Sequence, residues 1–121
     1  MIEEILDLLK RLPILRDCRV WQRDEAPSGA FAFKARCRVE ARFTFQIWIR
    51  RSSRGLRYAY QLVSGAESVL RWDNAPHFPN MKNFPHHFHD GKGKPSSSAL
   101  IGDPLRDLES VLSEIEKYLE T

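Results

Sequence analysis

The middle of the chain reads FAFKARCRV at residues 31–39 and FTFQIWIR at residues 43–50. In both segments apolar side chains alternate with polar or basic ones, which is the period of a half-buried β-strand. Two further alternating runs follow at residues 57–63 and 68–72, each after a short turn that contains glycine. Short connections between successive strands favour an antiparallel meander, and the alternation gives its sheet one apolar face and one basic face.

Apolar residues at helical spacing flank this sheet region on both sides. Residues 2–12 carry a short apolar stripe, and residues 103–120 carry a longer one that begins with the capping pair Asp103-Pro104. An earlier strand is expected from residue 15, so the sheet is predicted to span about residues 15–73 with four to five strands. Burying both stripes against the apolar sheet face predicts a single two-layer α+β domain over residues 1–121, an antiparallel meander with the N- and C-terminal helices packed on one face.

The composition limits the class of protein. With 42% hydrophobic and 29% charged residues, the chain is neither disordered nor collagen-like nor of low complexity. No apolar run reaches the ~18 residues that cross a bilayer, and the acidic Glu3 and Glu4 stand where a signal peptide is basic. We therefore expect a cytoplasmic protein with no membrane partner, in which Cys18 and Cys37 stay reduced and behave as small hydrophobic residues.

The net charge of +3 conceals an uneven distribution. Residues 103–121 hold six acidic and two basic side chains, whereas residues 13–102 hold a net charge of +8 and are rich in arginine. Because arginine contacts phosphate through a planar fork, the basic sheet face predicts a surface for nucleic acid, with a partner protein or no partner as alternatives. The residues expected to bind RNA are Arg36, Arg38, Trp48, Arg50 and Arg57.

All four histidines fall between residues 77 and 89, in a segment rich in proline. Proline disfavours a regular helix or a central strand, so residues 73–102 are predicted to form a long, shaped loop. Polar side chains on such a loop, held by a rigid sheet, are often functional. The candidate catalytic residues are Arg71, Asp73, Asn74, His77, His86, His87 and His89.

Three interpretations of these side chains remain open. Histidines can move the protons in metal-independent RNA cleavage while Arg71 stabilises the phosphorane and Asp73 and Asn74 position their neighbours. Alternatively, histidine and aspartate bind zinc or another transition ion, although adjacent histidines in an extended chain point in opposite directions, so that only His87 and His89 share a face. In the third interpretation the histidines are inert and pack over one edge of the sheet.

Two motifs in this segment resemble a known family. RWDNAPH at residues 71–77 and FPHH at residues 84–87, followed by His89, are similar to the signature of the TumE-type toxins, formerly a domain of unknown function. The similarity covers roughly residues 30–90, and it departs from the family pattern at Phe78, where a second histidine is expected. The resemblance implies a type II toxin that acts on RNA and has a helix-turn-helix antitoxin as its protein partner.

The sequence therefore favours the toxin half of a toxin–antitoxin pair, with metal-independent endoribonuclease activity and no cofactor. The alternatives are a non-catalytic module that binds nucleic acid or a partner protein, and a metal-dependent hydrolase. The sequence leaves open whether the protein forms a homodimer. An enzyme requires the imidazoles between residues 77 and 89 to meet in one accessible cleft beside the guanidinium of Arg71.

Overall fold

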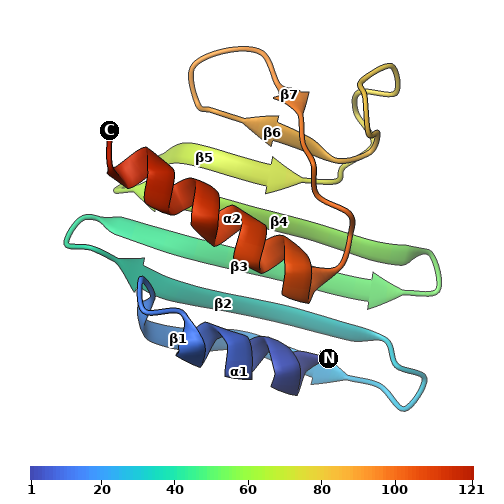
Figure 1. Cartoon of the computed structure of the whole chain (residues 1–121). Coiled ribbons are helices and arrows are strands. Elements are labelled where there is room, and N and C mark those ends of the chain that lie inside the picture. Colours follow the sequence, from blue (N-terminus) through green and yellow to red (C-terminus); the bar gives the residue numbers. More distant parts are fainter.

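Seven strands form one antiparallel meander in the computed structural model, which describes all of residues 1–121 (Figure 1). Each strand pairs with the next one along the chain, so the order in the sheet repeats the order in the sequence. The strands are β1 (Arg16–Glu25), β2 (Phe31–Val39), β3 (Phe43–Ser52), β4 (Gly55–Ser64), β5 (Glu67–Asp73), β6 (His87–His89) and β7 (Ser96–Ser97). The helices are α1 (Ile2–Arg11) and α2 (Pro104–Leu119).

Both helices cover the same face of the sheet, with α1 toward the β1–β2 edge and α2 nearer the middle (Figure 1). Asp103 caps α2 by accepting a hydrogen bond from the backbone N–H of Leu105 at 3.1 Å. The apolar stripes of the helices and the apolar face of the strands form one buried core of 24 residues. The predicted fold class, an α+β domain with both terminal helices on one face of the sheet, is confirmed. Neither helix combines the length and apolar character needed to span a bilayer.

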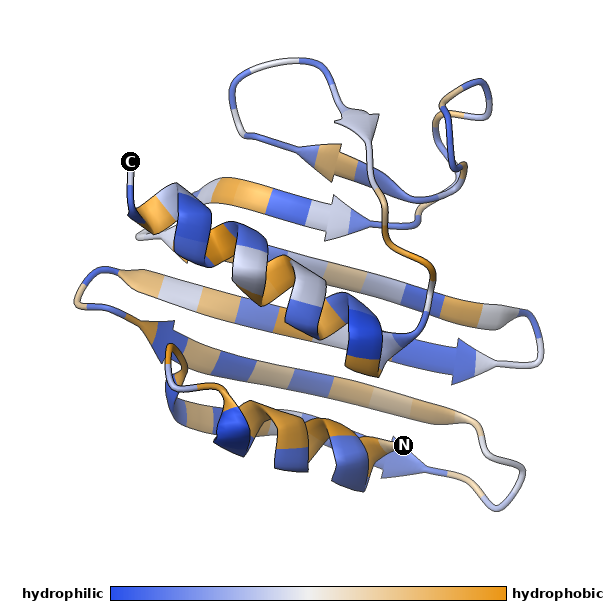
Figure 2. Ribbon diagram, viewed as in Figure 1, coloured by the Kyte–Doolittle hydropathy of each residue, from blue (hydrophilic) through white to orange (hydrophobic).

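The predicted alternation appears as two chemically different faces of the sheet. In β2 and β3 every second residue is buried, as at Phe33, Cys37 and Ile47, and Figure 2 shows apolar and polar positions alternating along these strands. The in-register pairing of β2, β3 and β4 brings the intervening polar residues together on the side without helices. We call this side, with residues such as Arg36 and Gln61, the open face.

The sheet has seven strands instead of the four to five that the sequence predicts. The two additional strands, β6 and β7, lie within residues 73–102, which we expected to be a loop. β6 pairs with the outer edge of β5, from Arg71 opposite His89 to Asp73 opposite His87. This pairing satisfies backbone groups that β5 would otherwise leave open. A strand of three residues is too short for alternation to reveal it in the sequence.

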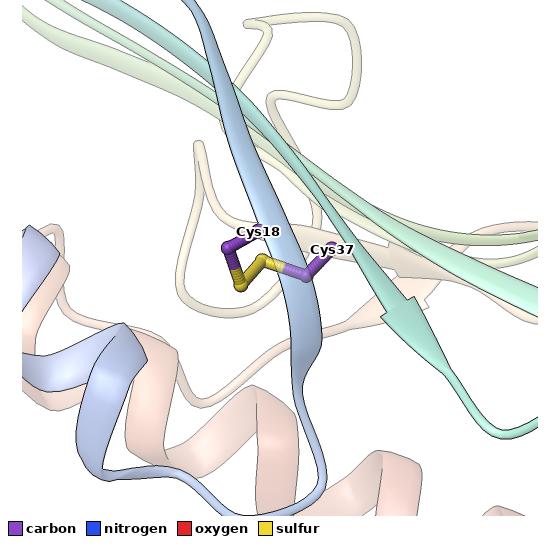
Figure 3. Close-up of a disulfide and its surroundings, with 2 residues drawn as sticks. All are labelled: Cys18 and Cys37. Atoms are coloured by element: carbon purple, nitrogen blue, oxygen red, sulfur yellow. A yellow bond between two sulfur atoms is a disulfide. The ribbon is translucent and has the colours of Figure 1, made fainter.

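A disulfide between Cys18 and Cys37 joins β1 to β2 (Figure 3). The expectation that both cysteines stay reduced is therefore wrong for this structure. The pairing of β1 with β2 shifts register between Arg16 and Arg19, and the two cysteine Cα atoms lie 4.0 Å apart across the strands. A register shift of this kind is a backbone irregularity that cannot be predicted from the residue types. The alternating pattern alone therefore could not show that Cys18 and Cys37 lie next to each other.

Candidate active site

Four of the candidate residues lie on two adjacent strands and share the open face. Arg71 and Asp73 are two residues apart on β5, and His89 and His87 stand opposite them on β6. The residues between them, Trp72 and Phe88, point to the other side, where Trp72 is buried in the core and Phe88 packs against it. We call Arg71, Asp73, His87 and His89 the Asp73 cluster.

Asp73 is the centre of the cluster and is only 5% exposed. One carboxylate oxygen, Oδ2, accepts a hydrogen bond from Nε of Arg71 at 2.9 Å. The other, Oδ1, lies 2.9 Å from Nε2 of His87 and accepts a hydrogen bond from the backbone N–H of Ala75 at 3.0 Å. Nε2 of His89 is 3.7 Å from Oδ2. A buried carboxylate is costly unless it is paired, and these groups surround it with hydrogen-bond donors and positive charge.

His87 is held from both sides and is 2% exposed. Its Nδ1 lies 3.1 Å from the carbonyl oxygen of Pro85, which can only accept, so Nδ1 carries a proton and donates it. Its Nε2 faces Asp73 Oδ1, which is also an acceptor. A proton shared between Nε2 and the carboxylate, or a metal ion bound to both, satisfies the two atoms. His87 positions Asp73 and is too deeply buried to reach a large substrate.

Arg71 and His89 are the members of the cluster that solvent can reach. The side chains of Arg71 and His89 are 39% and 32% exposed. Burial is the largest cause that lowers the pKa of His89; Asp73 opposes this effect, and the positive charges of His87, Arg71 and His77 add to it. A histidine with a lowered pKa is neutral near pH 7 and can accept a proton.

The loop after β5 returns to the cluster through Phe78. The ring of Phe78 meets that of His87 edge to face at 4.9 Å and lies 6.3 Å from that of His89. Its neighbour His77 is exposed and close enough for its charge to act on His89. Phe78 thus covers one side of the Asp73 cluster. His77 is the third imidazole near the cluster, since its charge acts on His89.

Asn74 follows Asp73 but has a different task. Its side-chain oxygen accepts a hydrogen bond from the backbone N–H of Tyr58 at 2.9 Å, and its amide nitrogen donates to the carbonyl of Leu56 at 2.7 Å. These bonds continue the pairing of β4 beyond the last residue of β5. Because the amide is 7% exposed and engaged at both ends, Asn74 is a positioning residue.

His86 lies away from the Asp73 cluster, on the side of the sheet that the helices cover. Its Nδ1 is 2.8 Å from the hydroxyl of Tyr58, a residue buried in the core, and the two rings are stacked. Burial lowers the pKa of His86 and raises that of Tyr58, so a neutral imidazole accepts from a protonated phenol. The expectation that all four histidines converge is therefore met by His87 and His89, with His77 nearby, and not by His86.

The ligating atoms of Asp73, His87 and His89 all lie within 4.8 Å of one another. Two imidazoles and a carboxylate are suitable ligands for a transition-metal ion. The Pro85 carbonyl orients His87 by accepting a hydrogen bond from Nδ1, as a carbonyl or carboxylate commonly does for the free ring nitrogen of a metal-binding histidine, and leaves Nε2 directed at the cluster. The same three side chains therefore fit either proton transfer or metal binding.

The open face of the sheet extends from the Asp73 cluster to β1. A pocket of about 380 Å³ lies on it, and its lining includes two of the predicted RNA-binding residues, Arg36 and Trp48, as well as Arg71. Arg50 and Arg57 face each other across β3 and β4 near one end of these strands, and Arg38 lies 4.0 Å from Asp17 near the other. Gln46 and Gln61, at polar positions of the alternating segments, also line the pocket, and so does Trp21, which the sequence pattern did not single out.

For Trp21 the sequence offered one signal, a tryptophan in a segment expected to be a strand. Trp21 lies in the irregular part of β1, where the register shifts between Val20 and Gln22, so alternation could not predict which face of the sheet its side chain joins. Gln46 and Gln61 occupy polar positions of alternating strands, which place both on the polar face, and the register of β3 and β4 sets them directly opposite each other.

Fold and site together define a class: a small α+β protein in which a basic open sheet face leads to a cluster of histidines around a buried aspartate. The model of one family, described as Toxin TumE, matches residues 5–119. The chain therefore belongs to the TumE toxin family, and the resemblance found in its motifs is confirmed. Membership in a toxin family implies an antitoxin partner. No curated protein and no solved structure matches the chain.

Proposed function

We propose that this toxin cleaves RNA at the Asp73 cluster without a metal ion. The observation that carries the proposal is the position of the cluster: a guanidinium and two imidazoles surround one buried carboxylate on the basic open face. Cleavage of a phosphodiester needs a proton acceptor, a proton donor and a fixed positive charge at the phosphorus. The exposed atoms of Arg71, His89 and His77 supply these three functions.

The reaction is an attack of the ribose 2′-oxygen on the adjacent phosphorus. Neutral His89 takes the 2′-hydroxyl proton as the bond from the 2′-oxygen to phosphorus forms. The bond from phosphorus to the 5′-oxygen breaks, and His77 donates a proton to that oxygen, which leaves a 2′,3′-cyclic phosphate and a 5′-hydroxyl. Arg71 stabilises the negative oxygens of the phosphorane, and Asp73 orients Arg71 and His89.

The RNA backbone follows the open face toward this cluster. The side chains proposed to hold it are Arg36, Arg38, Trp48, Arg50 and Arg57. All of them lie on β2, β3 and β4, and the four arginines are exposed. In this proposal the protein acts in the cytoplasm, where its substrate is found and where the Cys18–Cys37 bond is subject to reduction, and a helix-turn-helix protein is its antitoxin. Light scattering on the purified chain distinguishes a monomer from a homodimer.

A cleavage assay with matched histidine variants tests the proposal. The purified chain is incubated with a labelled RNA in the presence of a chelator, and the product ends are identified by mass spectrometry. We expect His89→Ala to lose cleavage by about 100-fold or more, because removal of a general base costs ~10²–10⁴ in rate. His86→Gln serves as the control, since His86 lies on the other side of the sheet. Loss of cleavage in His86→Gln with the fold intact, or full activity in His89→Ala, would contradict the proposal.

A metal-dependent hydrolase is the second candidate function, favoured by the close ligating atoms of Asp73, His87 and His89. It predicts stoichiometric zinc or another transition ion in the purified protein, and loss of cleavage with chelator. Binding of RNA without any cleavage, with or without metal, would instead favour the non-catalytic binding module.

A further inference from the structure

We propose that the pocket on the open face is a subsite that stacks an unpaired RNA base, which makes single-stranded RNA the substrate class of this toxin. The inference rests on the proposed function, because it places the pocket beside the atoms that act on the phosphodiester. It adds a recognition element, Trp21 on β1, that the catalytic proposal does not use.

Trp21 is 61% exposed, the most exposed large aromatic side chain of the chain. The guanidinium of Arg36 lies over its ring, 3.8 Å from the centroid, so the two side chains form one stacked platform. An exposed indole gains nothing from the core of its own chain, and it offers a nucleobase a large flat surface. Trp21 lines the same pocket as Trp48, which is half-buried.

Polar side chains line the pocket between these aromatic residues and the Asp73 cluster. Gln61 donates to Gln46 at 2.8 Å, and Arg71 donates to Gln61 at 3.5 Å, so the two amides are fixed in a row that leads to Arg71. Amide groups can hydrogen-bond the edges of a base that has left its pair. The pocket thus combines stacking surfaces with donors and acceptors.

The pocket and the cluster are joined by pairing across the strands. Trp48 stands opposite Ala59, and Ala59 stands opposite Asp73, so Trp48 and Asp73 are two strand spacings apart, roughly 10 Å. The small Ala59 side chain leaves the space between them open, and it also lines the pocket. A base stacked in the pocket therefore brings a neighbouring phosphodiester to Arg71.

The charge of the surface favours a polyanion, and the proposed function makes that polyanion RNA. Lys34, Arg36 and Arg71 line the pocket, and none of its lining residues is acidic. A duplex keeps its bases stacked inside, and the deep, narrow major groove of A-form RNA does not present them to side chains. Only an unpaired base can enter the pocket and stack on its tryptophans, so the pocket favours single strands over duplexes.

Binding to an RNA that cannot be cleaved separates this inference from the catalytic proposal. A fluorescent 2′-O-methyl RNA lacks the nucleophilic hydroxyl, and its affinity is measured by anisotropy in single-stranded form and as a hairpin duplex. We expect Trp21→Ala and Trp48→Ala to weaken single-strand binding by roughly 5- to 150-fold each, as loss of one base stack does. Ala59→Leu fills the pocket and should also weaken binding.

Tyr118→Ala is the matched control, because Tyr118 is an exposed aromatic residue on α2, which covers the other face of the sheet. It should leave the affinity unchanged. Equal affinity of wild type and the tryptophan variants, or equal affinity for strand and duplex, would overturn the inference. So would the finding that the chain binds no RNA. Binding that depends on the tryptophans in a protein that never cleaves RNA would keep the subsite and reject the nuclease.

Discussion

Asp73 shows how one residue can define a site. It is the last residue of β5, and two side chains of β6, those of His87 and His89, lie beside its carboxylate because β6 pairs directly with β5. Arg71 and His87 compensate the cost of burying the charge, and this compensation makes the cluster sensitive to any change at its centre.

Asp73→Asn should therefore lower both stability and activity. The amide carries no charge to pair with the guanidinium of Arg71. Whichever way it turns, its NH₂ group faces a donor, either Nε of Arg71 or the backbone N–H of Ala75. We expect a loss of about 3 kcal/mol in the free energy of unfolding, measured with urea, together with loss of RNA cleavage. Asp7→Asn, an exposed change on α1, is the control. Unchanged stability of Asp73→Asn would show that the cluster is not paired as described.

Asn74 allows a positioning role to be separated from a catalytic one. Asn74→Ala leaves the N–H of Tyr58 and the carbonyl of Leu56 without their partners. We expect it to lower the free energy of unfolding by about 2–4 kcal/mol, because each orphaned buried group costs ~1–3 kcal/mol. Cleavage per folded molecule, measured below the melting temperature, should stay within about threefold of wild type. A loss of 100-fold in a folded Asn74→Ala protein would place Asn74 among the catalytic residues instead.

At the level of elements, β1 pairs with only one other strand, β2. Most of its residues are exposed, it forms one edge of the sheet, and the disulfide ties it to β2. Trp21 belongs to this strand, so the stacking platform is only as well held as β1 itself.

Reduction of the disulfide should destabilise the fold without unfolding the core. Cys18 and Cys37 are 19 residues apart, a loop for which chain entropy predicts a contribution of about 3 kcal/mol. We expect dithiothreitol to lower the free energy of unfolding by about this amount in wild type and to have no effect on Cys18→Ala. Cys18 is the better position for the variant because Cys37 is fully buried. Identical urea curves of wild type with and without reductant would show that the bond adds nothing.

The whole molecule separates its charges between two faces. The open face is basic, whereas the exposed side of α2 is acidic, so a polyanion is attracted to one side of the protein only. An antitoxin can neutralise the toxin either by covering the basic open face or by binding at another surface.

The salt dependence of RNA binding measures this separation. Arg50 and Arg57 lie opposite each other on the open face, and each contact to a phosphate of a single strand adds about −0.7 to the slope of log affinity against log salt. We therefore expect Arg50→Ala and Arg57→Ala each to make the slope shallower by about 0.7. Glu116→Ala on α2 should not change the slope. Parallel salt titrations for all three variants and wild type would remove both arginines from the RNA path.

The helices and strands β2 to β5 were predictable because each is long enough for its period to repeat, whereas β1, whose register shifts twice, shows no period in its burial. The pattern repeats several times within residues 31–39 and within residues 104–119, and the structure has a strand and a helix over these residues. β6 and β7 were not predictable, since three and two residues carry no period and depend on the free edge of β5 for their bonds.

The sequence by itself determined the fold class, the separation of a basic from an apolar sheet face, and the family, because these follow from local periodicity and from contiguous motifs. Even the opposite directions of His86 and His87 follow from the geometry of an extended backbone. Only the tertiary structure decided which histidines lie beside Asp73, that Cys18 and Cys37 pair, and on which face of the sheet Trp21 lies. Those outcomes depend on strand register and on a bulge, and register is fixed by packing between residues far apart in the chain.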